Sequence, residues 1–219
     1  MYGEESLAGL ADLVANEDLY LIADEIYAKI VYDGKRFKSL AEFEAIRDRV
    51  LIISGVSKAY AMTGWRIGYA LGPKSLVAEM GKIQSHTTSN PTSISQWAAI
   101  AALSGPQDCV EQMREKFRER RDRIYERLSG MPGVQPLRSQ GAFYFFPDVS
   151  RLFGKRFGGQ EIRNSVDLCQ FLLDEQKVAI VPGSAFGSEQ HVRISFATSL
   201  AVLEEAMDRI EAGLQKLDS

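Results

Sequence analysis

The sequence has little of the chemistry that metal sites and disulfide-stabilised folds require. Its 219 residues include two histidines, His86 and His191, and two cysteines, Cys109 and Cys169. With no Cys or Asp cluster at ligand spacing, we expect no zinc or other metal site. Each cysteine lies in an apolar, helix-like stretch, QDCVEQM or VDLCQFLL. We therefore expect both to be buried free thiols in a reducing compartment.

Long apolar runs and an excess of positive charge are also missing. No run approaches the roughly 20 residues that a membrane-spanning helix needs, and MYGEESLAGL does not have the pattern of a signal peptide. The net charge of −3 gives no electrostatic reason to expect nucleic acid or an anionic membrane as partner. These absences predict a cytoplasmic protein that acts on small molecules or proteins.

The apolar residues that are present indicate an α/β fold in the first half of the chain. Residues 5–15 have helical spacing, and the apolar run LYLIADEIY follows them as a buried strand. VLIISGV at 50–56 is a second such run, and RIGYALG is a shorter third. Near-continuous apolar strands separated by helices predict a mainly parallel sheet with helices on both faces.

A long helix and a smaller α+β unit are expected in the second half. The apolar stripe from Pro106 to about Leu128 predicts one helix, and its arginines alternate with acids, which favours a solvated, salt-bridged face over a nucleic-acid site. Strands at GAFYFFPDV, VAIVPG and HVRISFA, a helix at SVDLCQFLLDEQ and a final helix capped by Ser199 follow. The expected parts are 1–105, a connecting helix at 106–130, and 131–219.

Two basic residues stand in the stretch SGVSKAYAMTGWRIGY, residues 54–69. Lys58 occupies a small-residue turn behind a buried strand, where partial desolvation would favour the neutral amine that attacks carbonyls. Arg66 lies between Gly64 and Gly68, which allow the backbone to approach a ligand, and its guanidinium suits phosphate. A solvated surface lysine is the alternative, because most lysines are exposed.

Further polar residues lie where the predicted strands end or cross the core. Asp24 is at the carboxyl end of the first strand, where open α/β sheets bind ligands, and Tyr27 follows it. Arg193 is a charge within an apolar strand pattern, which a substrate carboxylate or an internal acid would have to pair. Asp24 as a turn cap and Tyr27 as packing remain alternatives, and so does Ser57 as a plain turn serine.

Together these motifs resemble the class I aminotransferase family of fold type I enzymes that depend on pyridoxal phosphate, and above all its prokaryotic aspartate aminotransferase branch. The matching stretches are ADEIY, SGVSKAYAMTGWRIGY, GAFYFFP, VAIVPGSAFG and VRISFATS. They occur in the family's order and cover almost the whole chain. The segment with the lysine and the arginine is the most specific of them.

The resemblance implies a role for each candidate residue. Lys58 would form the internal aldimine of pyridoxal phosphate and move the proton at the substrate α-carbon. The other roles implied are the pyridine nitrogen for Asp24, the ring oxygen for Tyr27, the phosphate for Arg66 and Ser57, and the substrate α-carboxylate for Arg193. The family further implies transfer of an amino group from an L-amino acid, with aspartate favoured, to a 2-oxo acid by a homodimer.

The sequence also departs from the family pattern. The position three residues before Lys58, a serine in some relatives, is Gly55. Family members have well over a hundred residues before the helix that starts here near Glu4, so the chain resembles the carboxyl-terminal portion of such an enzyme. A sheet with an uncovered edge and a bare apolar face is then expected. A non-catalytic ligand-sensing module and an inactive fragment remain alternative functions, as do other pyridoxal phosphate reactions of the fold.

Overall fold

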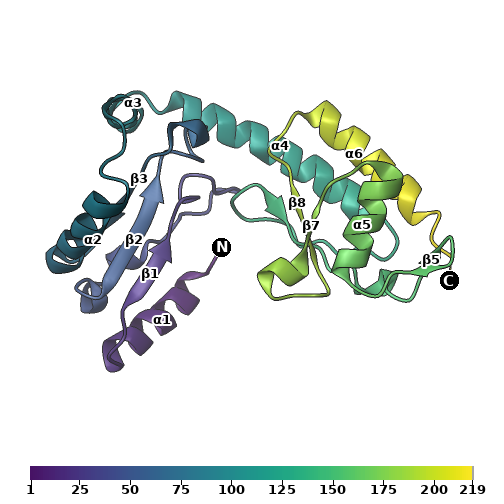
Figure 1. Cartoon of the computed structure of the whole chain (residues 1–219), viewed down its shortest axis with the longest axis horizontal. Helices are drawn as coiled ribbons and strands as arrows, with labels where there is room; N and C mark the ends of the chain where they lie inside the picture. Colours follow the sequence, from purple (N-terminus) through teal and green to yellow (C-terminus); the bar gives the residue numbers. More distant parts are fainter. Residues whose placement is uncertain (219) are drawn as a thin grey trace. The chain divides into compact units, whose positions relative to one another are not determined.

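In the computed structural model, which describes residues 1–218, the chain divides into two compact units, Met1–Arg114 and Glu115–Ser219. The first unit contains one three-stranded sheet, and the second contains a three-stranded and a two-stranded sheet (Figure 1). The boundary between the units falls inside the long helix predicted at 106–130. The division expected from the sequence, into 1–105, a connecting helix at 106–130 and 131–219, stays a prediction.

The first unit consists of one helix, three short strands joined through loops with 3-10 turns, and then further helices. Its elements are α1 (Glu4–Asn16), β1 (Leu21–Asp24), β2 (Val50–Gly55), β3 (Gly68–Leu71), α2 (Lys74–Thr87), α3 (Ser93–Ser104) and the start of α4 (Asp108–Gly130). Three 3-10 turns, η1 (Leu40–Glu42), η2 (Glu44–Ile46) and η3 (Thr63–Trp65), lie in the connections. The helix at residues 5–15 and the three strands therefore form where the sequence predicts them.

The core of the first unit lies between α1 and one face of the sheet. Leu7, Ala11 and Val14 recur at spacings of three and four residues, so they share one face of α1. They pack in one cluster with Val50 and Ile52 of β2. This packing of α1 against the sheet stabilises the two strands whose carboxyl ends form one edge of the sheet.

The sheet itself is less parallel than the sequence pattern suggested. In the order β1-β2-β3, β1 pairs parallel with β2, but β3 runs antiparallel to β2. The physical reason is the connection: residues 56–67 contain turns and a 3-10 segment, without the crossover helix that a parallel neighbour usually needs. Among the described strands of this sheet, the prediction of a mainly parallel arrangement was therefore wrong for β3.

The expected cover on both faces of the sheet is also incomplete in residues 1–218. Ile22 of β1 is 70% exposed and Leu71 of β3 is 59% exposed. β1 is thus not the fully buried strand that its apolar run predicted, because only alternate residues face α1. The register pairs Ile22 with Leu51 and Leu71 with Ile52, so these two exposed apolar residues lie on opposite faces of the sheet, and the single bare apolar face expected from the sequence stays a prediction.

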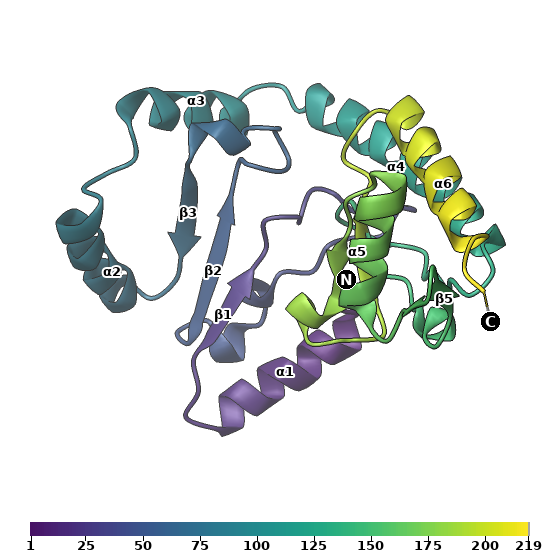
Figure 2. The same cartoon turned by 45° about the vertical axis from the view of Figure 1, so that its right-hand side comes forward.

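The second unit is an α+β arrangement of small sheets and three helices. It contains the rest of α4, then β4 (Tyr144–Phe145), β5 (Arg156–Phe157), β6 (Gln160–Glu161), α5 (Ser165–Gln176), β7 (Val181–Pro182), β8 (Val192–Ser195) and α6 (Leu200–Leu214). Two 3-10 turns, η4 (Ser150–Leu152) and η5 (Gly183–Phe186), complete it. The main sheet has the antiparallel order β4-β8-β7, and α6 lies beside α4 and α5 (Figure 2).

The local helix signals of the second unit were accurate. α5 covers the predicted SVDLCQFLLDEQ, and α6 begins at Leu200 behind the predicted cap. The Ser199 side chain accepts a hydrogen bond from the Val202 backbone N–H at 3.3 Å, which satisfies one of the free donors of the first helical turn.

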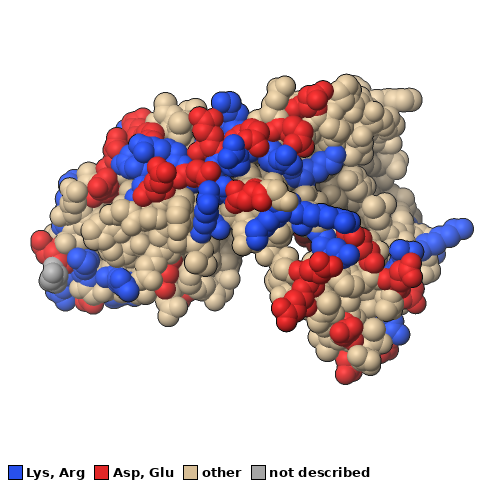
Figure 3. All heavy atoms as spheres, turned by 180° about the vertical axis from the view of Figure 1, so that it is seen from behind, with Lys and Arg blue, Asp and Glu red and all other residues tan. Residues whose placement is uncertain are grey.

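The charged face of α4 is largely as predicted, with one exception. Arg118 pairs with Glu115, and Lys116 with Glu119, each three residues apart. Basic and acidic side chains are mixed over the face of the molecule in Figure 3. Arg121, however, is fully buried and donates to the Ser139 carbonyl oxygen at 2.9 Å, so this arginine is not part of the solvated face.

Both cysteines are free thiols, but their surroundings differ. Cys169 on α5 is buried as predicted, and this burial raises the pKa of its thiol to about 12. Cys109 is exposed, so its predicted burial was wrong. Cys109 lies in the first turn of α4, next to Val110, and of these two neighbours only the valine is buried in the core.

Residues 1–218 contain neither a metal-binding cluster nor a helix that could span a membrane. These residues include no group of three or more His, Cys, Asp or Glu side chains suited to a metal ion. No helix among them has the length and apolar character that crossing a membrane would need.

Candidate active site

The carboxyl ends of the two parallel strands bring Asp24 and the lysine turn to one edge of the sheet. Asp24 ends β1 and is the register partner of Ile53 on β2. β2 continues to Gly55, and Lys58 follows three residues later in a turn. Neighbouring parallel strands have their carboxyl ends at the same edge of the sheet. Asp24 and Lys58 therefore both lie at that edge.

The lysine turn is closed by its own backbone. The Tyr60 N–H donates to the Val56 carbonyl at 3.2 Å, and the Met62 N–H donates to the Ser57 carbonyl at 3.1 Å. Lys58 is partly buried, and its Nζ lies 6.0 Å from the centroid of the Tyr27 ring. The structure therefore brings Lys58 and Tyr27 together, and Lys58 is not a fully solvated surface lysine.

The carboxylate of Asp24 lies at this edge and accepts one hydrogen bond from its own turn. One oxygen, Oδ1, accepts from the Ile26 backbone N–H at 3.1 Å, which is a turn-capping contact. Within residues 1–218 no ion pair involves Asp24, and the residue is exposed. Turn capping thus accounts for one carboxylate oxygen of Asp24, and the other oxygen is available to a ligand.

Arg66 stands at the same edge through the antiparallel strand. Gly68 of β3 is the register partner of Gly55, so Arg66 lies just beyond the end of β2. Its backbone is left-handed, with φ of 52°, and its guanidinium Nη1 donates to the Thr63 carbonyl at 2.8 Å. No carboxylate pairs with Arg66 among the described residues. An exposed arginine without an acidic partner is suited to an anion.

A residue that sequence reasoning missed holds the arginine turn. Ser95, near the start of α3, is 6% exposed, and its hydroxyl donates to the Trp65 carbonyl at 2.7 Å. Thr92 caps α3 and donates to the Ser95 hydroxyl at 3.1 Å. These residues, with Arg66, line a hollow of about 980 Å³. The polar cluster TTSNPTS was the available signal.

The remaining residues singled out in the sequence, Ser57, Gly55 and Arg193, lie in three different surroundings. Ser57 is partly buried in the lysine turn, with its carbonyl committed to Met62. Gly55 sits where a Cβ would lie 3.0 Å from Gly68 Cα, so close strand packing explains a glycine there. Arg193 lies on β8 in the second unit and has no ion pair within residues 1–218, which removes the internal salt-bridge alternative for that part of the chain.

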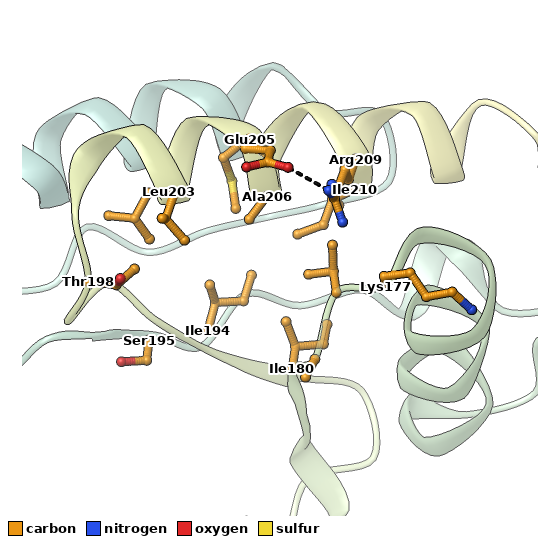
Figure 4. Close-up of a pocket in the computed structure, with 14 residues that line it drawn as sticks. Lys177, Ile180, Ile194, Ser195, Thr198, Leu203, Glu205, Ala206, Arg209 and Ile210 are labelled. Atoms are coloured by element: carbon orange, nitrogen blue, oxygen red, sulfur yellow. Dashed lines mark hydrogen bonds and ion pairs between the residues drawn. The ribbon is translucent and has the colours of Figure 1, made fainter.

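A second hollow of about 460 Å³ lies within the second unit and contains none of the predicted site residues (Figure 4). Its apolar side chains come from the segment before β7, from β8 and from α6, with Ile180, Ile194 and Leu203 among them. Glu205 and Arg209 form an ion pair at its rim. Its polar lining includes the hydroxyl groups of Ser195 and Thr198 and the amine of Lys177, which donates to the Asp174 carbonyl oxygen at 2.6 Å.

Comparison with known proteins decides the family. The model of the aminotransferase class I and II family matches residues 1–210. The chain belongs to this family. An aspartate aminotransferase of Bacillus subtilis is 45% identical over 217 residues, which are 99% of the chain and 54% of that protein. An asparagine–oxo-acid transaminase of Streptococcus mutans is 40% identical over 99% of the chain and 54% of its own length.

Solved structures agree with this family assignment. The crystal structure of an aspartate aminotransferase from Rhizobium meliloti matches 99% of the chain with a TM-score of 0.95 and 43% identity, and the match covers 55% of that structure. The aminotransferase resemblance and the α/β fold class expected from the sequence are thereby confirmed. The chain spans about half the length of the relatives it matches.

The groups at the sheet edge fit pyridoxal phosphate by their chemistry. This aminotransferase-family chain offers there an amine in Lys58, a carboxylate in Asp24, a phenol in Tyr27 and an arginine without an acidic partner in Arg66. These are the groups that would hold, in turn, an aldehyde, a protonated pyridine nitrogen, a ring oxygen and a phosphate. Of these groups, the Asp24 carboxylate and the Arg66 guanidinium form no ion pair within residues 1–218.

Proposed function

We propose that the protein of which this chain is part or whole is an aminotransferase that moves an amino group from an L-amino acid to a 2-oxo acid. The observation that carries the proposal is the partly buried amine of Lys58, 6.0 Å from the Tyr27 ring, at the edge where β1 ends in Asp24. The names of the relatives, most of them aspartate aminotransferases, support L-aspartate as the preferred amino donor.

In this proposal, each residue has one task toward pyridoxal phosphate. When bound, the cofactor supplies an electron sink for negative charge at the amino acid's α-carbon. Lys58 would hold the cofactor's aldehyde carbon and would take and return the proton at the substrate α-carbon. Asp24 accepts from the protonated pyridine nitrogen, because a carboxylate stabilises that positive charge.

The other residues hold the anionic and phenolic groups in place. Arg66 donates to the phosphate, and the adjacent Ser57 hydroxyl adds a neutral hydrogen bond to it. Tyr27 donates to the ring oxygen. Arg193 binds the substrate's α-carboxylate, which suits an arginine that lacks an acidic partner in the described chain.

The cellular setting and the assembly belong to the same proposal. We take the protein to be cytoplasmic and the working enzyme to be a homodimer, as the family resemblance implies. The exposed apolar side chains of Ile22 and Leu71, which the strand register places on opposite faces of the sheet, are consistent with further protein surface covering it. Light scattering at several protein concentrations would detect the dimer, and a mass equal to one chain throughout would contradict it.

The activity is tested by following the amino nitrogen. The protein is supplied with pyridoxal phosphate, 15N-labelled L-aspartate and 2-oxoglutarate, and 15N-glutamate is detected by mass spectrometry. We expect labelled glutamate from the protein and none from Lys58→Ala. Lys82→Ala is the control, since Lys82 is an exposed residue of α2 paired with Glu79, and it should retain activity. Equal transfer by both variants, or labelled glutamate without the protein, would contradict the proposal.

A non-catalytic ligand-sensing module remains the second candidate. It would bind cofactor or amino acid at the same residues but transfer no nitrogen. Binding of pyridoxal phosphate, seen as a new absorbance band, together with no 15N transfer would favour it.

A further inference from the structure

The guanidinium of Arg193 contacts two aromatic rings. Its guanidinium carbon lies 4.7 Å from the centroid of the Tyr144 ring and 4.4 Å from that of the Phe186 ring. All three residues belong to the second unit, and Arg193 is partly buried on β8. Both distances are within the roughly 6 Å at which a cation is attracted to an aromatic face.

This contact accounts for a charge that the strand would otherwise tolerate poorly. Within residues 1–218 no carboxylate pairs with Arg193, so the two rings are its recorded stabilising neighbours. Phe186 in turn is 48% exposed, so burial in the core does not explain why a large apolar ring stands there. The position of the ring against the guanidinium does explain it.

The turn that carries Phe186 is rigid. A Cβ on Gly183, the first residue of η5, would lie 2.2 Å from the His191 carbonyl oxygen, so only glycine fits. Gly187 closes the turn with φ of 78°, a value that favours glycine. Phe146 and Phe186 form a T-shaped pair with ring centroids 6.0 Å apart, and Phe146 stacks on His191 at 4.8 Å. The Phe186 ring therefore has a second aromatic contact besides Arg193.

Tyr144 is fixed by the neighbouring strand and loop. It lies on β4, opposite Ser195 of β8, in the register that ties β4 to the strand of Arg193. Its carbonyl oxygen accepts a short hydrogen bond from the Ser139 hydroxyl. The Ser139 carbonyl accepts from the buried Arg121 at 2.9 Å, so a core residue anchors the loop that leads to Tyr144.

We propose that Tyr144 and Phe186 are positioning residues that cover the two faces of the Arg193 guanidinium and leave its N–H edge to the substrate carboxylate. A guanidinium binds a planar carboxylate in its own plane, through two parallel N–H donors. Rings on both faces fix that plane and exclude ligands that approach from above or below. The inference rests on the role proposed above for Arg193 and adds the residues that orient it.

The ring contacts can be tested without cofactor or activity. In 15N-labelled protein, the Hε proton of Arg193, assigned by its loss in Arg193→Lys, should be shifted upfield by the ring currents. Phe186→Leu should move this signal toward the position typical of a solvated arginine, and Phe186→Tyr should not. Leu137→Ala, at an 80% exposed apolar residue of the same unit, is the matched control and should leave the signal unchanged.

The same signal then reports carboxylate binding. Titration with 2-oxoglutarate should shift it saturably in the wild-type protein. Phe186→Leu should raise the Kd about 3- to 30-fold, the range expected when one cation–aromatic contact is lost. Phe186→Tyr should stay within about twofold of the wild type, because the ring is kept. Thermal melting of each variant confirms that it is folded, and Tyr144→Leu, which removes the other ring and should likewise raise the Kd, provides the answer if Phe186→Leu does not fold.

The possible failures are distinct. If the Arg193 signal of the wild-type protein shows no ring-current shift, the two-ring contact is wrong, whatever the function. A contact that is present but whose loss leaves the Kd unchanged overturns the positioning role. If the ring-current shift is present and 2-oxoglutarate never perturbs the signal, the carboxylate role of Arg193 fails, and the positioning role fails with it.

Discussion

Gly55 and Gly68 are register partners in the antiparallel pairing of β2 with β3, and a Cβ on Gly55 would lie 3.0 Å from Gly68 Cα and 3.2 Å from the Ile67 carbonyl oxygen. The two strands approach this closely where β2 ends, three residues before Lys58. The contact is between backbones, which have little room to move. The glycine pair therefore sets how the lysine turn and the arginine turn leave the sheet.

Gly55→Ala should destabilise the protein by about 1–3 kcal/mol, the usual cost of forcing atoms into a filled space. Gly9→Ala on α1 is the matched control, because a Cβ there meets nothing within 4 Å. Alanine in place of a mid-helix glycine should stabilise by about 0.5–1 kcal/mol. Urea unfolding of both variants measures the effect, and a Gly55→Ala protein as stable as the wild type would contradict the strand geometry.

Glu204 on α6 should make stability depend on acid pH. Hydrogen bonds from the Arg123 and Arg127 guanidinium groups hold the pKa of its carboxyl below the usual value of 4.5. A depressed pKa in the folded state adds stability above the unfolded pKa, and this is lost as the pH falls through the folded pKa. Glu204→Gln should therefore be less stable than the wild type near about pH 7, with a smaller difference near about pH 3.

Urea unfolding at the two pH values measures that difference. Glu175→Gln on α5 is the control, because Glu175 is exposed and forms no recorded ion pair in the described chain, and its effect should be small at both pH values. A stability loss for Glu204→Gln that is equally large near about pH 3 would show that the carboxylate charge is not its origin.

The two cysteines should react at very different rates. Cys169 is buried with a thiol pKa of about 12, whereas Cys109 is exposed. Because the thiolate is the reactive form, iodoacetamide should modify Cys169 of the native protein at least about 100-fold more slowly than Cys109. Peptide mass spectrometry quantifies both sites. In urea the rates should become similar, and equal rates in the native protein would contradict the burial of Cys169.

Substitution of Arg66 and of Arg193 should weaken the binding of two different anions, the cofactor phosphate and the substrate carboxylate. Arg66→Ala should weaken pyridoxal phosphate binding about 10- to 100-fold, as expected for loss of charge-assisted hydrogen bonds, and leave 2-oxo acid binding to the apoprotein nearly unchanged. Arg193→Ala should do the reverse. Calorimetric titration with each ligand gives both constants for both variants, so each variant is the control of the other. Equal weakening of both ligands by Arg193→Ala would show a structural role for this arginine.

The elements that the sequence predicted well are those fixed by local chemistry. α5 matches its predicted stretch because an apolar period of 3.6 coincides with a side-chain cap at Asn164, and α6 starts behind Ser199 for the same reason. Asp24 and Lys58 reach one edge because Asp24 ends β1 and Lys58 follows β2, two parallel strands that the apolar runs predict, whereas Arg66 precedes the antiparallel β3. The presence of Asp24 and Lys58 at that edge was predictable, whereas the cofactor had to come from the resemblance.

Features set by tertiary contacts were not predictable. α2 has no buried residue, and α3 leaves Ile94 and Trp97 72% exposed, so neither helix presents the simple apolar stripe that identifies a helix. The direction of β3 depends on the turns in residues 56–67. The burial of Arg121 depends on the Ser139 carbonyl, 18 residues away. The rings around Arg193 come from segments that no local pattern joins.

The attachment of cofactor to Lys58 is the claim on which the others depend. The protein, shown to be folded by circular dichroism, is incubated with pyridoxal phosphate, reduced with borohydride and digested, and the modified peptide is located by mass spectrometry. The account predicts that the mass of the reduced cofactor is found on Lys58 and is absent there when the phosphate site is removed in Arg66→Ala at limiting cofactor. Cofactor mass on Lys29 or another lysine of the folded protein, with Lys58 unmodified, would contradict it.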